Sequence, residues 1–323
     1  MLERAVRSAL GQSHRDLEVW IYDNDSGDET AEVAARLAAL DPRVHYHAHA
    51  SNLGSFANFR YAIEHVRTPF FSVLADDDML LPDFHRLALQ SFSESPGLGM
   101  VGLDCLHSEL GGALLRRSAI RPGAYAPPEG MLEMLRQGHL SWSSVLFRSE
   151  VIDLIGGIDA GADLYLDLDV LLRVAAHFPF VVRPEPGAVF FYHEAASGSS
   201  ASDDPGRWVA FGHLIDRTAA DSTLPPSLRQ EAVGRLRTML RALLVKNGVG
   251  AARRGNAAAA ATAARELRAR LGDLPGSSAV QLVALAARMP GGRTMLERIA
   301  RGRRPYTGER LIDRVPGGTG LSP

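Results

Sequence analysis

The feature that most constrains the fold is an apolar run, residues 69–75, that ends at three consecutive aspartates. A run of this length, rich in Phe, Val and Leu, predicts a buried β-strand. The strand would deliver Asp76, Asp77 and Asp78 to one edge of a sheet, where their charges repel one another unless a cation binds. Hard divalent ions such as Mg2+ prefer oxygen ligands, so one hypothesis is a metal site. In the other, one aspartate caps the next helix and the rest are solvated.

Strand and helix patterns alternate up to about residue 200. Apolar runs predict strands at residues 17–22, 44–47, 69–75, 100–103, 143–147 and 189–192. Amphipathic spacing predicts helices at residues 2–10, 30–40, 55–66, 82–92, 131–138, 149–155 and 164–177. The alternation predicts an α/β fold with a mostly parallel sheet flanked by helices on both faces. The region 109–128 is richer in Gly and Arg and predicts an antiparallel excursion with a loop.

Composition limits the compartment and the chemistry. The chain has 323 residues, of which 46% are hydrophobic, so it can bury a sizeable core. Cys105 is the only cysteine, which excludes an internal disulfide and a thiolate metal site and fits a reducing compartment. Residues 2–10 read as a charged helix and not as a secretory signal, and no apolar stretch approaches the roughly 20 residues of a membrane span. We therefore expect a cytoplasmic protein, soluble or membrane-peripheral.

Charge is divided unevenly along the chain. From Leu224 onward there are 18 Lys and Arg against 6 Asp and Glu, whereas the preceding residues carry 17 against 31. This asymmetry predicts an α/β domain at residues 1–223 and a basic, helical C-terminal region at residues 224–323. The basic region either contacts an anionic membrane or presents a solvated helical face. The residues predicted to contact lipid are Arg293, Arg298, Arg301, Arg303 and Arg304, around Leu296 and Ile299.

Polar residues also end other predicted strands. Asp23 closes the strand at 17–22 and is followed by Asn24 and Asp25. Its carboxylate can accept hydrogen bonds from a nucleobase or a ribose hydroxyl at the sheet edge, although the same residues also read as a helix cap. Asn52 and Gly54 form a second turn, which either contacts a phosphate or ribose or simply begins the next helix.

Two further groups are candidates for catalysis or ligand binding. Asp167 and Asp169 lie on one predicted helix, roughly 200° apart around its axis, so one can reach a cleft while the other faces solvent or Arg173. A cleft carboxylate separate from the metal ligands suits a general base, whereas a surface aspartate is the alternative. His193 ends an apolar strand and can ligate a metal or donate to a phosphate, although most histidines at strand ends do neither.

Several short motifs follow one another along the chain in an order typical of one known family. They occupy residues 2–13, 17–30, 52–54, 75–83, 147–148, 156–159, 167–173 and 192–199. Together they resemble the family 2 glycosyltransferases of the GT-A fold, over about residues 2–200. The resemblance implies an inverting, metal-dependent hexosyl- or deoxyhexosyltransferase of cell-envelope polysaccharide synthesis. Such an enzyme moves a sugar from a nucleotide-sugar to a hydroxyl acceptor, which is a glycan, a lipid-linked glycan or a small molecule, and needs no nucleic acid.

The same resemblance implies a role for each candidate residue. Asp23, with Asn24 and Asp25, matches the segment that binds the base, and Asn52 and Gly54 belong to the same nucleotide site. The acidic motif holds Mg2+ or Mn2+ on the diphosphate; we assign Asp76 to the nucleotide and Asp77 and Asp78 to the metal. Asp167 matches the catalytic base, and His193 matches a histidine close to both diphosphate and metal.

The chain also departs from the family pattern. It begins inside the first helix, where the family normally opens with a strand, so we expect a truncated or misassigned start. Leu166 stands where an acidic residue usually precedes the base, and Ala75 stands where some members have the first aspartate of the acidic motif. Two alternatives therefore stay open. One is a catalytically silent nucleotide-binding or scaffold protein with an incomplete sheet, and the other is a nucleotidyltransferase.

Overall fold

A computed structural model describes residues 1–109, 114–118, 120–192 and 205–289 of the chain. The chain divides into two compact units. The first contains Met1–Ala160 and Leu166–Tyr192, and the second contains Gly161–Tyr165 and the described residues from 205 onward.

The first unit begins with a small parallel sheet covered by two helices. The elements are α1 (Leu2–Leu10), β1 (Val19–Asp23), α2 (Thr30–Leu40) and β2 (Val44–Ala48). Alternate residues of β1 turn to the covered face, where Ile21 meets Val6, Leu37 and Val44 in a buried cluster. The opposite face lies next to α3 (Ser55–Glu64), whose Tyr61 stacks on His47 of β2. Because β1 and β2 are parallel, the loops that follow them lie at the same edge.

A second, seven-stranded sheet forms the centre of the first unit. Its order is β3-β8-β5-β9-β4, with β6 on β5 and β7 on β9. The strands are β3 (Phe70–Ser72), β4 (Met79–Leu80), β5 (Met100–Glu109), β6 (Leu114–Arg117), β7 (Gly123–Tyr125), β8 (Val145–Arg148) and β9 (Phe180–Tyr192). The α/β fold is confirmed. Within this sheet β5 and β9 pair in parallel and the other pairs are antiparallel, so parallel pairing is less extensive than the alternation predicts.

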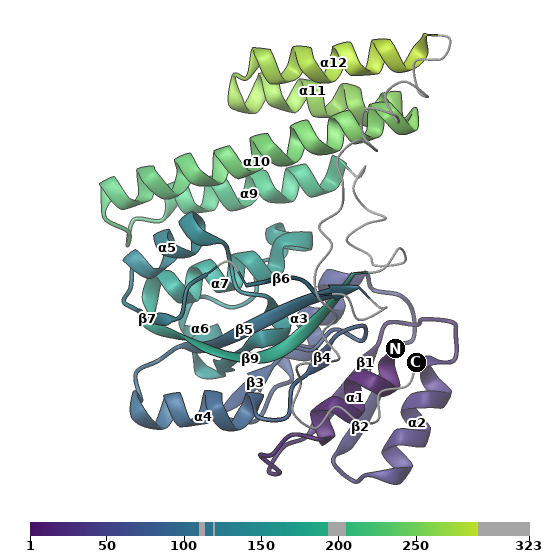
Figure 1. Ribbon diagram of the computed structural model, residues 1–323, viewed down its shortest axis with the longest axis vertical. Helices are drawn as coiled ribbons and strands as arrows, with labels where there is room; N and C mark the ends of the chain where they lie inside the picture. The colour runs from purple at the N-terminus through teal and green to yellow at the C-terminus, as the bar shows by residue number, and fades with distance from the viewer. Residues whose placement is uncertain (110–113, 119, 193–204, 290–323) are drawn as a thin grey trace. The chain divides into compact units, whose positions relative to one another are not determined.

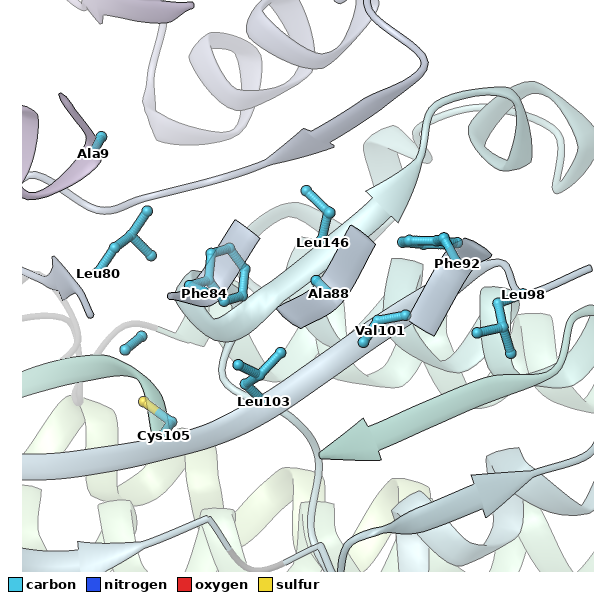
Figure 2. Close-up of a cluster of buried hydrophobic side chains, with 11 residues drawn as sticks. Ala9, Leu80, Phe84, Ala88, Phe92, Leu98, Val101, Leu103, Cys105 and Leu146 are labelled. Atoms are coloured by element: carbon cyan, nitrogen blue, oxygen red, sulfur yellow. The ribbon is translucent and has the colours of Figure 1, made fainter. Parts of the chain in front are cut away.

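Helices of the first unit pack on the larger sheet. They are α4 (Phe84–Glu94), α5 (Glu129–Gln137), the 3-10 turn η1 (Trp142–Ser144), α6 (Glu150–Leu154) and α7 (Leu166–His177); the 3-10 turn η2 (Ala160–Tyr165) precedes α7. Figure 2 shows the core where α4 meets β5. Phe84 and Phe92 of α4 lie two turns apart, and Val101 and Leu103 are alternate residues of β5. Burial raises the pKa of the Cys105 thiol in this cluster to about 12, so the thiol behaves as an apolar core group.

The second unit consists of four helices, drawn in green to yellow in Figure 1. They are α9 (Pro205–Ala220), α10 (Pro226–Arg254), α11 (Ala257–Leu271) and α12 (Leu274–Arg288). Small residues let these helices approach closely, since a Cβ atom on Gly248 of α10 would lie 2.8 Å from that of Ala263 on α11. The unit includes α9, whereas the charge pattern places a boundary at Leu224, because α9, with two arginines and one aspartate, precedes the run of basic residues that begins in α10. None of the described helices is long and apolar enough to cross a bilayer.

Candidate functional site

The three carboxylates of the acidic turn between β3 and β4 differ in their exposure to solvent. Asp76 is exposed, Asp77 is half-buried and Asp78 is buried, with 1% of its surface accessible. The Asp78 carboxylate accepts hydrogen bonds from the Ser143 hydroxyl on η1 and, at 3.2 Å, from the Phe191 amide on β9. Burial raises the pKa of Asp78 to about 6, although both hydrogen bonds oppose this shift. Asp78 therefore anchors the turn to the sheet, while Asp76 and Asp77 lie nearer to solvent.

Asp23 is held at the end of β1 by its neighbours. One carboxylate oxygen accepts from the Ser26 amide at 3.1 Å and from the Ser26 hydroxyl at 2.6 Å, and the other accepts from the Tyr46 hydroxyl at 2.8 Å. Burial by itself would raise the pKa of Asp23, but the hydrogen bonds from Ser26 and Tyr46 outweigh it and lower that pKa. The charged carboxylate is thus fixed in orientation at the edge where the predicted nucleotide site lies.

The two loops at this edge are joined by a pair of asparagines. The Asn24 amide nitrogen donates to Asn52 Oδ1 at 3.1 Å, and Asn24 Oδ1 accepts from the Leu53 amide at 2.8 Å. Asn52 Oδ1 also accepts from the Gly54 amide at 2.9 Å, and Gly54 has a positive φ of 84° that favours glycine. Asp25 is exposed with a φ of 57°, a conformation that aspartate tolerates. The structure therefore brings Asn24, Asn52 and Gly54 together beside Asp23.

Helix α7 separates the roles of its two aspartates. Asp169 is 1% exposed, and its carboxylate pairs with Arg173, whose Nε lies 2.8 Å away. The same guanidinium donates to the carbonyl oxygens of Ile155 at 2.9 Å and Gly157 at 2.7 Å. Of the two aspartates, one was expected to face solvent or Arg173, and the structure shows that this one is Asp169. Asp167 lies half-buried in the first turn of α7, and its role as a base stays a prediction.

Sequence reasoning missed a polar network at the end of β9. The Tyr192 hydroxyl accepts from Arg116 at 3.0 Å and lies 3.3 Å from His107 Nδ1, while His107 Nε2 lies 3.4 Å from the Ser141 hydroxyl. Burial lowers the pKa of His107 to about 4, and the charge of Arg116 adds to this shift. The serine-rich residues 141–144 were the available signal, but residues 143–147 were predicted as a strand. His193, which follows this network in the chain, lies outside the described residues.

The carboxylates of the acidic turn can supply part of the coordination shell of a divalent cation. Among the described residues, no group of three or more His, Cys, Asp or Glu side chains is placed to hold a metal by itself. Asp76 and Asp77 nevertheless supply hard oxygen donors outside the core. Mg2+ is commonly bound by one or two carboxylates together with substrate phosphates and water. The acidic turn therefore fits a cation that arrives with a diphosphate and not a cation held by protein alone.

Comparison with known proteins finds a family match over the N-terminal part of the chain. A model described as glycosyl transferase family 2 matches residues 1–135. Chondroitin synthase of Escherichia coli is 28% identical over 178 residues, which are 55% of this chain and 25% of that protein. The chain thus spans a quarter of the length of this relative.

Two solved structures share the fold. A crystal structure of S. aureus TarS 1-349 in complex with UDP has a TM-score of 0.60 and 12% identity, over 94% of this chain and 88% of that one. The mannosyltransferase PcManGT from Pyrobaculum calidifontis, in complex with GDP-Man and Mn2+, has a TM-score of 0.50 and 19% identity, over 93% and 80%. These likenesses confirm the GT-A type of α/β fold. The match of residues 1–135 supports a member of glycosyl transferase family 2.

Proposed function

We propose that the protein is an inverting glycosyltransferase that uses Mg2+ or Mn2+ and a nucleotide-diphosphate sugar. The observation that carries the proposal is the acidic turn, in which buried Asp78 anchors the backbone and Asp76 and Asp77 lie outside the core. Carboxylates in this arrangement suit a metal-bound diphosphate better than a helix cap, because the helix that follows begins only at Phe84.

The nucleotide would bind at the edge formed by the loops after β1 and β2. The fixed carboxylate of Asp23 is placed to accept a hydrogen bond from the base, because its hydrogen bonds to Ser26 and Tyr46 hold its orientation. Asn24, Asp25, Asn52 and Gly54 would line the adjacent loops, and Asp76 would contact the ribose or diphosphate. The complexes of TarS with UDP and of PcManGT with GDP-Man support a nucleotide ligand.

We assign the metal to Asp77, next to Asp76, which would contact the nucleotide. The sequence predicts Asp78 as a second metal ligand, but its hydrogen bonds to Ser143 and Phe191 suit the role of an anchor better. His193 remains a predicted ligand outside the described residues. When bound, the cation would neutralise the charge that develops on the departing nucleoside diphosphate.

Asp167 is proposed as the base that accepts the proton of the acceptor hydroxyl. That oxygen would attack the anomeric carbon from the face opposite the diphosphate, so the configuration inverts in one displacement. The ion pair between Asp169 and Arg173 supports this role, because it fixes the first turn of α7 against the loop that contains Gly157. Asp167 then has a defined position relative to the sheet.

The substrate class is proposed from the relatives. The relative named chondroitin synthase supports a polysaccharide acceptor, and we propose hexosyl or deoxyhexosyl transfer to a growing or lipid-linked glycan of the cell envelope. The enzyme would work in the cytoplasm. Contact with anionic lipid through the basic residues 293–304, which lie outside the described residues, is part of this proposal.

The proposal is tested by calorimetry and product analysis on the full chain. UDP, GDP and dTDP are titrated with and without MnCl2, and the matching nucleotide-sugars are then incubated with glycan acceptors. We expect one nucleotide to bind in a Mn2+-dependent way and its sugar to be transferred with inversion, as read by NMR of the anomeric proton. Release of pyrophosphate would indicate a nucleotidyltransferase. Absence of binding by every nucleotide would indicate a silent scaffold.

A further inference from the structure

Helix α1 presents a line of polar side chains to the backbone around the acidic turn. Arg4, Ser8 and Gln12 are spaced by four residues, so they lie near one face of the helix and its C-terminal cap. The Ser8 hydroxyl accepts from the Leu80 amide at 3.0 Å, and the Gln12 amide nitrogen donates to the Leu81 carbonyl oxygen at 2.7 Å. The short strand β4 is therefore tied to α1 by side chains on one side.

Arg4 makes the contact nearest to the carboxylates. Its Nη2 donates to the carbonyl oxygen of Asp77, and its Cζ lies 4.1 Å from the centroid of the Phe191 ring. The Phe191 amide in turn donates to the Asp78 carboxylate at 3.2 Å. Phe191 is thus held at its ring by Arg4 and at its backbone by Asp78. One guanidinium joins the first helix, the acidic turn and the end of β9.

We infer that Arg4 is a positioning residue for the donor site, which sets the geometry of the acidic turn against the end of β9. The inference rests on the proposed function. The carbonyl oxygen that Arg4 binds belongs to the peptide between Asp77 and Asp78, and rotation of that peptide would redirect both side chains. Since the Asp77 carboxylate would contact the metal, small rotations there should weaken the metal-dependent part of nucleotide binding.

The chemistry of arginine suits this position. A guanidinium is planar, so it can stack on the Phe191 ring while an N–H group in its plane reaches the Asp77 carbonyl. An ammonium group could donate to the same oxygen but could not stack in this way. Lysine should therefore restore only part of the function of Arg4.

The same helix offers a matched control. Arg7 lies one turn from Arg4 and pairs with Glu3 at the surface, where its side chain is 61% exposed. It has the same charge and length as Arg4 and makes no contact with the turn among the described hydrogen bonds. Arg7→Met should therefore leave nucleotide binding unchanged.

The experiment measures the affinity of UDP, or of whichever nucleotide binds the wild-type chain, with and without MnCl2 by calorimetry. Arg4→Met should lower the gain in affinity that Mn2+ provides by roughly tenfold or more, as expected for a lost hydrogen bond to a charged donor. Arg4→Lys should give an intermediate value. If Arg4 had a purely structural role, the folded fraction of the variant would show the same gain in nucleotide affinity from Mn2+ as the wild-type chain.

If Arg4→Met folds poorly, a double-mutant cycle of Arg4→Lys with Phe191→Leu still tests the inference. Leucine retains the backbone amide that Asp78 accepts from but removes the ring, so it should reproduce part of the loss. The combined effect of Arg4→Lys and Phe191→Leu should be smaller than the product of the two single effects. Wild-type Mn2+ dependence in Arg4→Lys and Phe191→Leu would overturn the inference while the proposed function stands. Failure of the wild-type chain to bind any nucleotide would instead overturn the proposed function.

Discussion

The carboxylate of Asp78 is buried against the hydroxyl of Ser143, which lies 65 residues further along the chain. Ser143→Ala removes the donor and leaves a buried carboxylate oxygen unsatisfied. We expect the free energy of unfolding to fall by about 1–3 kcal/mol in denaturant titrations. Ser93→Ala is the control, because the Ser93 hydroxyl donates to the Gln90 carbonyl at an exposed site. Equal stability of the two variants would contradict the anchoring role of Asp78.

The buried ion pair between Asp169 and Arg173 should matter far more to stability than a surface pair of the same spacing. Arg173→Met removes the guanidinium that pairs with buried Asp169 and takes the same donor away from the carbonyl oxygens of Ile155 and Gly157. We expect a loss of about 3–5 kcal/mol in the free energy of unfolding. Arg60→Met breaks the pair with Glu64, where both side chains are nearly half exposed, and should cost less than about 1 kcal/mol. Chemical denaturation of both variants provides the comparison.

His85 should make stability fall as the solution becomes acidic. Burial lowers the pKa of His85 in the folded chain to about 4, from an ordinary value of 6.5. Above pH 6.5 the residue is neutral whether folded or unfolded, so it has no effect on the pH dependence. Between pH 6.5 and 4 the unfolded chain takes up a proton that the folded chain does not, so the free energy of unfolding decreases.

His85→Gln should remove this part of the pH dependence. The difference in unfolding free energy between pH 7.5 and pH 5 should become smaller in the variant, by on the order of 2 kcal/mol. Thermal or urea unfolding at both pH values measures it. An unchanged difference would mean that His85 takes up its proton as readily in the folded chain as in the unfolded one.

If the proposed reaction is correct, substitutions of Asp77 and Asp167 should affect different steps. Asp77→Asn should abolish the gain in nucleotide affinity that Mn2+ provides. Asp167→Asn should leave nucleotide binding intact and lower kcat by roughly 10²–10⁴-fold, the usual contribution of a general base. Calorimetry together with a transfer assay separates the two effects. Asp153→Asn, at an exposed position of α6 that is not part of the proposed site, serves as the control.

Local patterns were enough to predict the elements whose period is uninterrupted. The bounds predicted for α1 and α2 match the structure, because their apolar residues follow one face without a break. By contrast, only residues 189–192 of β9 were predicted, since Pro184 and Pro186 disfavour a strand. The structure accommodates them with register shifts on either side of Asp104 in β5, which is paired with Pro186. A bulge of this kind depends on the partner strand and leaves no local signal.

In the candidate site, too, local patterns were predictable and contacts between distant parts of the chain were not. Helical geometry placed Asp167 and Asp169 on different sides, and Arg173 four residues after Asp169 was a local partner that the sequence could reveal. The three aspartates of the acidic turn look equivalent in the sequence. Only contacts with Ser143 and Phe191, which are distant along the chain, set Asp78 apart from Asp76 and Asp77. The network of Tyr192 and His107 was missed for the same reason.

The clasp between Asn24 and Asn52 has a consequence for how such chains can diverge. Each asparagine amide makes hydrogen bonds to the other loop. Lengthening one loop would therefore leave hydrogen-bond donors of the other loop without acceptors. Insertions near the two positions should therefore be tolerated only as matched pairs. Among homologous sequences, the lengths of these loops and the identities of their asparagines should covary.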